Sequence, residues 1–109
     1  MRAMLAVAFL AVGGLATRSA HATRAPRHIT VHIANFAYAP ADTTLAAGDT
    51  VVWINDDDFE HVVAADSAAW KSPTLSRGGT YVWVAARAGR MPYHCAAHPV
   101  MHGALTIAQ

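Results

Sequence analysis

Short runs of apolar residues separated by turn signals characterise the chain after residue 27. In His28–Ile33 every second residue is aliphatic, which predicts a strand with one buried face and with His28 and His32 facing solvent. Tyr81–Ala85 is apolar on both faces, which favours a place in the middle of a sandwich. Further extended segments are predicted at Thr43–Leu45, Val51–Ile54, His61–Ala64, Tyr93–Cys95 and Gly103–Ile107.

The spacing of these segments predicts the fold class. No segment after residue 22 has a sustained helical period, and the turn signals include Ala47–Thr50, Arg77–Thr80 and Ala88–Arg90. Asn55–Glu60 is predicted as a loop and Asp66–Ser76 as irregular. Short strands at this spacing are typical of an all-β sandwich or barrel, and 109 residues suffice for one domain.

The N-terminal segment has the three parts of a secretory signal peptide. Met1 and Arg2 precede an apolar run, Ala3–Ala16, and Ala20-His21-Ala22 matches a small-residue cleavage site. We therefore predict a signal peptide at 1–22, a domain at 23–109, and a periplasmic or otherwise exported protein. The apolar run is too short to span a bilayer comfortably, so an uncleaved anchor is the less favoured alternative.

Cleavage changes the charge balance. The whole chain has a formal net charge of +1, but loss of Arg2 and Arg18 leaves six basic against seven acidic residues, a net charge of −1. Such a balance gives no electrostatic case for nucleic acid. We expect a monomer with no nucleic-acid partner and no membrane span in the mature chain.

The chain contains one cysteine, which lies among potential metal ligands. Cys95, His98 and Met101 are spaced by three residues each. A thiolate, an imidazole and a thioether together suit copper better than zinc or the hard cations, which prefer other donors. One more imidazole would complete the two-histidine, one-cysteine set with a weak axial methionine of a blue-copper site. A bound metal would also protect a thiol that has no partner for an intrachain disulfide.

His61 is the candidate for that second imidazole. It begins a predicted strand directly after the Asn55–Glu60 loop, whereas Cys95 ends a strand, so both lie at one end of a sandwich. The alternative is that His61 is a buried or capping histidine and Cys95 a small core residue, with no metal between them. His28 and His32 lie on one strand, roughly 13 Å apart, and cannot bind one metal together. Neither His94 nor His102 is assigned to the metal.

The segment Tyr93–Gly103 resembles the copper loop of the cupredoxins, and its two-residue gaps match the amicyanin type. Phe36–Pro40, Ala47–Asn55 and His61–Val63 resemble the first half of small amicyanin-like domains. The resemblance implies a Greek-key β-sandwich with one type 1 copper that transfers single electrons and is not an enzyme. It also implies a ligand set, which is His61, Cys95, His98 and Met101.

Two residues depart from the usual site. Val62 stands where asparagine is usual, so its side chain offers no hydrogen bond, and Pro99 has no N–H. We therefore expect few hydrogen bonds to the thiolate.

The expected partner is a redox protein that docks near His98, where Pro99 and Val100 supply apolar surface. The acidic run Asp56–Asp58 either steers a basic partner or forms a solvated turn. The competing function is a copper-handling module, a chaperone, store or sensor, that uses the same four ligands.

Overall fold

The structure is a computed structural model that describes residues 8, 13–14 and 24–109. The predicted signal peptide, 1–22, lies outside the described residues except at residues 8, 13 and 14. No helix in the described part of the chain is long and apolar enough to cross a membrane.

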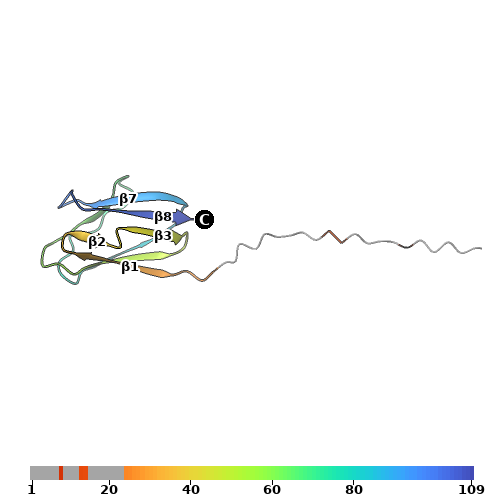
Figure 1. Ribbon diagram of the computed structural model, residues 1–109, viewed down its shortest axis with the longest axis horizontal. Helices are drawn as coiled ribbons and strands as arrows, with labels where there is room; N and C mark the ends of the chain where they lie inside the picture. Colours follow the sequence, from red (N-terminus) through yellow and green to blue (C-terminus); the bar gives the residue numbers. More distant parts are fainter. Residues whose placement is uncertain (1–7, 9–12, 15–23) are drawn as a thin grey trace, which may run out of the picture.

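Two four-stranded sheets pack face to face, as predicted for a β-sandwich (Figure 1). The first sheet has the order β2-β1-β4-β6, and its strands are β1 (His28–Ala34), β2 (Ala37–Ala39), β4 (Thr50–Asn55) and β6 (Thr80–Val84). The second has the order β3-β8-β7-β5, and its strands are β3 (Asp42–Ala46), β5 (Val63–Ala65), β7 (Gly89–Cys95) and β8 (His102–Ala108). The pairs β1–β4 and β3–β8 are parallel, and the other pairs are antiparallel.

The alternation of residues in the strands places one face of each sheet in the core. In β1, Val31 and Ile33 are fully buried, whereas His28 and His32 are exposed as predicted. The centre of the sandwich is aromatic, and the Trp53 ring packs edge-on against Tyr93 with 5.4 Å between ring centroids. Burying such large rings removes apolar surface from water, which stabilises a domain of this size at about 25 cal/mol per Å².

The prediction for Tyr81–Ala85 was wrong in its position. The strand β6 lies at the edge of its sheet and pairs with β4. Tyr81 and Trp83 face the core, whereas Val82 and Val84 are 53% and 55% exposed. Valine favours strands because its branched side chain fits a pleated surface, so a valine-rich run does not by itself indicate burial on both faces.

Two predicted boundaries also move. His61 lies before β5 and forms an isolated bridge with Leu75, so the predicted strand at His61–Ala64 begins at Val63. The strand β7 already begins at Gly89, inside the turn predicted at Ala88–Arg90.

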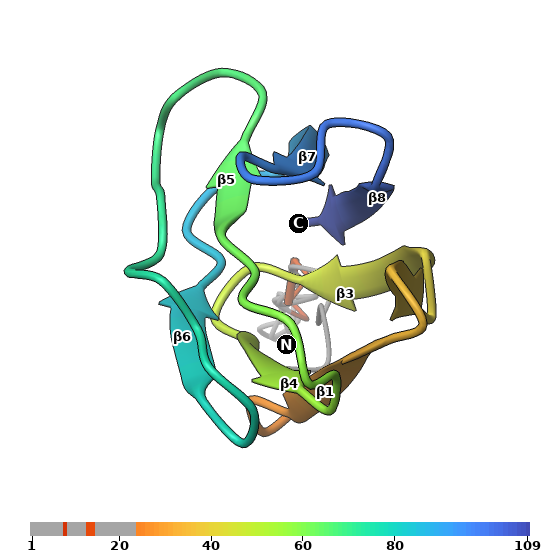
Figure 2. The same ribbon diagram turned by 90° about the vertical axis from the view of Figure 1, so that its left-hand side faces the viewer.

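The two connections that carry the predicted metal ligands lie at one end of the sandwich. Figure 2 views this end, where the chain leaves β4 in one sheet and crosses to β5 in the other. The loop between β7 and β8 lies at the same end. The segments that carry the predicted ligands therefore lie at the same end of the sandwich, as expected from their places at strand ends.

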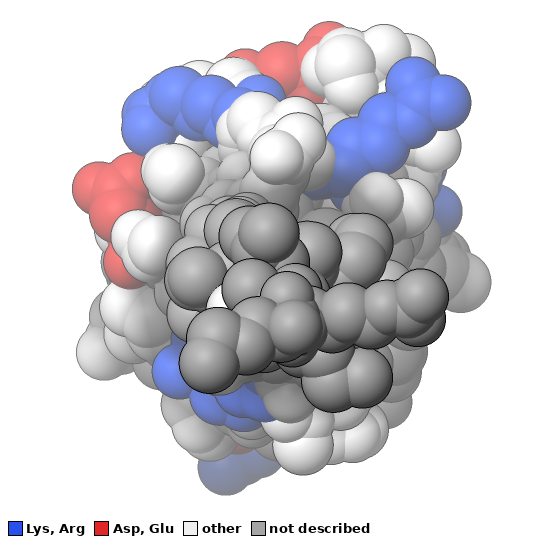
Figure 3. Space-filling view, turned by 90° about the vertical axis from the view of Figure 1, so that its right-hand side faces the viewer, with Lys and Arg blue, Asp and Glu red and all other residues white. Residues whose placement is uncertain are grey.

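At the opposite end of the sandwich, Asp49 stabilises the fold through several hydrogen bonds. Its buried carboxylate accepts two hydrogen bonds from the Arg24 guanidinium, at 3.0 and 2.7 Å, and one each from the N–H groups of Ala46 and Arg27. The bond from Arg24, followed by those from the two N–H groups, holds the pKa of Asp49 well below its usual range. Figure 3 views this end and shows basic side chains, in blue, at its surface.

Replacing Asp49 with asparagine should therefore lower the melting temperature at pH 7. A carboxylate whose pKa falls on folding stabilises the fold above its unfolded pKa of about 3.9, and that contribution is lost as the pH falls further. In thermal melts, the difference in melting temperature between wild type and Asp49→Asn should become smaller below about pH 4. The control is Asp58→Asn, because Asp58 forms an exposed pair with Arg77. Equal melting temperatures for wild type and Asp49→Asn at pH 7 would contradict this role.

Candidate metal centre

Three predicted ligands meet at the loop end of the sandwich. The ligating atoms of His61, Cys95 and His98 lie within 4.8 Å of one another. The Cys95 Sγ atom lies 3.8 Å from His61 Nδ1 and 3.7 Å from His98 Nδ1. His61 and Cys95 are fully buried, whereas His98 is partly exposed. The same nitrogen of both rings thus faces the sulfur, and the group has one side toward solvent.

Backbone pairing fixes the position of His61. Its N–H donates to Leu75 O at 3.1 Å, and the Leu75 N–H donates to His61 O at 2.8 Å. The His61 Nε2 atom lies 2.8 Å from Asp57 Oδ2. A carboxylate at Nε2 favours the tautomer with the proton on Nε2, which leaves Nδ1 free to bind a metal beside the sulfur.

Cys95 ends β7 opposite Val63 of β5. Its N–H donates to Met101 O at 3.2 Å, and its Sγ accepts the N–H of Val62 at 3.4 Å. The side chain of Val62 is not needed for this bond, because the donor is the main chain. Within the described part of the chain, the sulfur thus accepts one backbone N–H, which agrees with the expectation of few hydrogen bonds.

The loop between β7 and β8 is closed by its own backbone. The Met101 N–H donates to His98 O at 3.0 Å, while Met101 O accepts the Cys95 N–H. Met101 is only 2% exposed, whereas Ala97 and Pro99, which flank His98, are exposed. The loop therefore turns the methionine inward and leaves small apolar residues at the surface around His98.

Asp57 has a role that sequence reasoning missed. Its carboxylate accepts the N–H groups of Asn35 at 2.6 Å and Phe36 at 3.0 Å, in addition to facing His61. Asn35 and Phe36 both have a left-handed backbone, with φ of 53° and 57°. A left-handed backbone is tolerated by asparagine but costly for a bulky residue such as Phe36, and the carboxylate that accepts both N–H groups helps to hold the turn.

Burial alone would raise the pKa of Asp57, but the N–H groups of Phe36 and Asn35 and the His61 ring lower it overall. The carboxylate is therefore ionised and acts as an acceptor. The neighbouring acids are also paired, Asp56 with His32 and Asp58 with Arg77. The run that suggested a solvated or steering turn thus contains one residue that supports the metal group directly.

Phe36 covers the two histidines. Its ring packs edge-on against His61 and His98, with centroid distances of 5.4 and 5.1 Å. No local signal in the sequence places Phe36 over residues that lie 25 and 62 positions away along the chain. The turn held by Asp57 puts the ring there.

The donors fit a copper ion. Two imidazole nitrogens and a cysteine sulfur lie close enough together to bind one ion, and a buried thioether-bearing residue, Met101, lies at the end of the same loop. Thioether is a poor ligand for zinc, and the group contains no carboxylate oxygen for a hard cation.

No protein-family model matches the chain. Curated relatives match the chain, however. An amicyanin from Paracoccus denitrificans is 30% identical over an alignment of 120 residues, which covers 98% of this chain and 92% of that protein. An amicyanin from Paracoccus versutus is 27% identical over 84 residues, or 72% of this chain and 64% of the relative.

Solved structures give the same relationship. A Cu(I) form of a methionine-to-alanine variant of amicyanin superposes with a TM-score of 0.71 at 33% identity, over 80% of this chain and 88% of that one. An oxidised proline-to-alanine variant of amicyanin gives 0.70 at 34%, over 74% and 82%. Together with the sandwich and its cysteine–histidine group, this similarity shows that the chain belongs to the amicyanin family of small blue-copper electron carriers.

Proposed function

We propose that His61, Cys95, His98 and Met101 bind one type 1 copper ion, through which the protein carries single electrons. The observation that carries the proposal is the convergence of two imidazole Nδ1 atoms on one buried thiol sulfur. When bound, copper supplies the one-electron couple between Cu(I) and Cu(II).

The residues around the ligands restrict their movement. His61 is held by its backbone pair with Leu75 and by Asp57, and Cys95 is held in the β5–β7 ladder. Full burial of His61 and Cys95 excludes water from that side of the group. Ligands that keep the same positions in both oxidation states keep the reorganisation energy of electron transfer low, which suits an electron carrier.

His98 is the proposed electron port. It is the partly exposed member of the three-residue group, and apolar side chains lie around it. The exposed apolar residues Phe36 and Val100 are 40% and 87% accessible, and Phe59 packs on Phe36 with 5.0 Å between centroids. We call Phe36, Phe59 and Val100 the apolar rim. A small apolar surface of this kind fits the brief contacts of redox proteins.

The proposed cellular location rests on the sequence. The tripartite segment 1–22 supports export with cleavage after Ala22, which leaves a domain of residues 23–109. Sequencing the N-terminus of the exported protein checks this point, and a chain that starts before Thr23 would contradict it.

Adding copper to the purified mature protein should give an intense blue colour, because charge transfer from a thiolate to Cu(II) absorbs strongly. Cys95→Ser should bind copper without that band, and His28→Ala, which alters an exposed histidine at the far end of the sandwich, should retain it. Visible absorption spectroscopy is the measurement. A colourless wild-type product would contradict an electron-carrier site.

Retention of the ion distinguishes a carrier from a copper-handling module. The carrier should keep its copper through repeated oxidation and reduction in the presence of a chelator. Release of the ion within a few cycles would favour the chaperone, store or sensor instead.

Asp57→Asn should weaken copper binding by about 10- to 100-fold, which is the usual effect of removing a carboxylate that orients a ligating histidine. The change removes the anionic partner of His61 and one acceptor of the Asn35–Phe36 turn. Competition with a Cu(I) chelator measures the affinity. The matched control is Asp56→Asn, because Asp56 pairs with the exposed His32. Equal affinities for the two variants would show that Asp57 does not support the site.

Val100→Glu should slow electron self-exchange between oxidised and reduced copies by about tenfold or more, which corresponds to ~1.4 kcal/mol. Two copies that meet through their rims would bring like charges together. Line broadening in NMR spectra of mixed oxidation states measures the rate. Val84→Glu, on the exposed face of the edge strand β6, is the control. A rate unchanged by Val100→Glu would place the port elsewhere.

A further inference from the structure

Two histidines outside the copper group lie directly opposite each other. His94 of β7 and His102 of β8 are partners in the antiparallel ladder. The N–H of Cys95 donates to Met101 O, so the next pair along, His94 and His102, is of the non-hydrogen-bonded kind. In such pairs the side chains approach most closely, with Cβ atoms about 5 Å apart.

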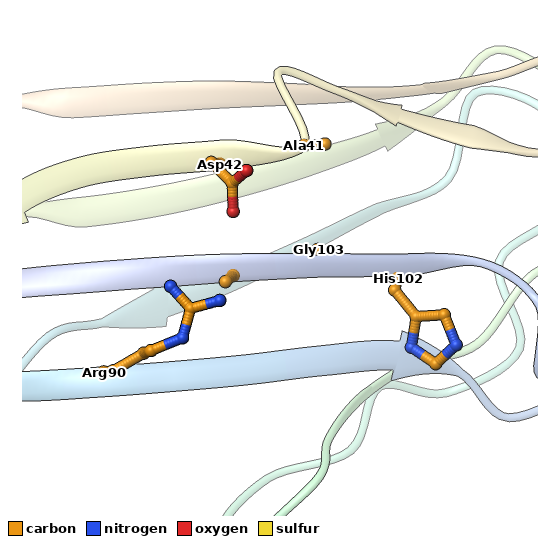
Figure 4. Close-up of a pocket in the computed structure, with 6 residues that line it drawn as sticks. Ala41, Asp42, Arg90, His102 and Gly103 are labelled. Carbon is orange, nitrogen blue, oxygen red and sulfur yellow. The ribbon is translucent and has the colours of Figure 1, made fainter.

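Both histidines lie on the outer face of the sheet. The neighbours Tyr93 and Cys95 point into the core and are fully buried, so His94 faces outward between them. His102 is exposed and lines a surface hollow of about 200 Å³ with Asp42 and Arg90. Figure 4 shows the His102 ring directed from β8 toward the end of β7, the strand that carries His94.

Asp66 orients the first of these rings. Its Oδ1 atom lies 2.6 Å from His94 Nδ1, and Asp66 is itself fixed by a bond from its N–H to Pro92 O at 3.0 Å. A carboxylate on Nδ1 holds the proton there and leaves the Nε2 lone pair free. Carboxylate–histidine pairs of this kind commonly stand behind metal-ligating histidines.

We propose that His94 Nε2 and the His102 imidazole form a second, surface metal site for a divalent transition-metal ion, with Asp66 as the positioning residue. Imidazole pairs suit Zn²⁺, Ni²⁺ and Cu²⁺, of which Cu²⁺ binds most strongly. Water fills the remaining coordination positions, so the site is open and exchangeable. It is separate from the copper group because His94 and Cys95 project to opposite faces of β7.

The test is zinc titration of the mature protein loaded with Cu(I). Zinc chloride should bind with a stoichiometry of one per chain in calorimetry, and the NMR signals of the His94 and His102 rings should shift while those of His28 do not. Reoxidation should return the full blue colour, which shows that zinc has not displaced copper. No binding of zinc, or shifts confined to other histidines, would overturn the proposal.

Single variants separate the roles of the residues. His94→Gln or His102→Ala should each abolish the zinc-dependent shifts, and Asp66→Asn should weaken zinc binding by about tenfold. His28→Ala is the matched control, since it removes an exposed histidine from the other sheet. Retention of the blue band in every variant shows that the fold is intact. Zinc affinity unchanged in both His94→Gln and His102→Ala would rule out the site.

Discussion

The pairing of β5 with β7 is the constraint on which the metal centre depends. The register places Val63 opposite Cys95, so the chain just before β5 must pass beside the cysteine sulfur. That register brings the N–H of Val62 to the sulfur and puts His61 next to it. A slip of one residue would turn Cys95 to the outer face of its strand and separate the donors. The positions of His61 and Cys95 are thus set by the pairing of β5 with β7, and the loop between β7 and β8 adds His98 to them.

The carboxylate of Asp57 extends this constraint to the other sheet. It binds a turn that follows β1 and, at the same time, the imidazole of His61. The turn is strained at Asn35 and Phe36, and the strain is offset by the two N–H bonds that an ionised carboxylate accepts. The result is a phenyl ring laid across both histidines, at the surface where a partner would arrive.

Much of this could be predicted from the sequence, because the signals are local. Alternation in β1 and the spacing of Cys95, His98 and Met101 are properties of a few consecutive residues, and they predicted the sandwich and a copper-type donor set. The role of Asp57 could not be predicted, since it depends on contacts with two separate segments, the turn 21 and 22 positions before it and His61 four positions after it. The edge position of β6 was missed for a related reason, as a strand's neighbours are set by topology and not by its own composition.

We infer that the protein, and not the metal, sets the arrangement of the donors. Ladder register, the His61–Leu75 bridge and the Asp57 contacts all join one protein group to another. The most direct measurement is a pair of crystal structures, of the metal-free and the copper-loaded mature protein. We expect His61, Cys95 and the Phe36 ring to occupy the same positions in both structures. A metal-free structure in which His61 has left the sulfur, or in which the Asn35–Phe36 turn has relaxed, would contradict it.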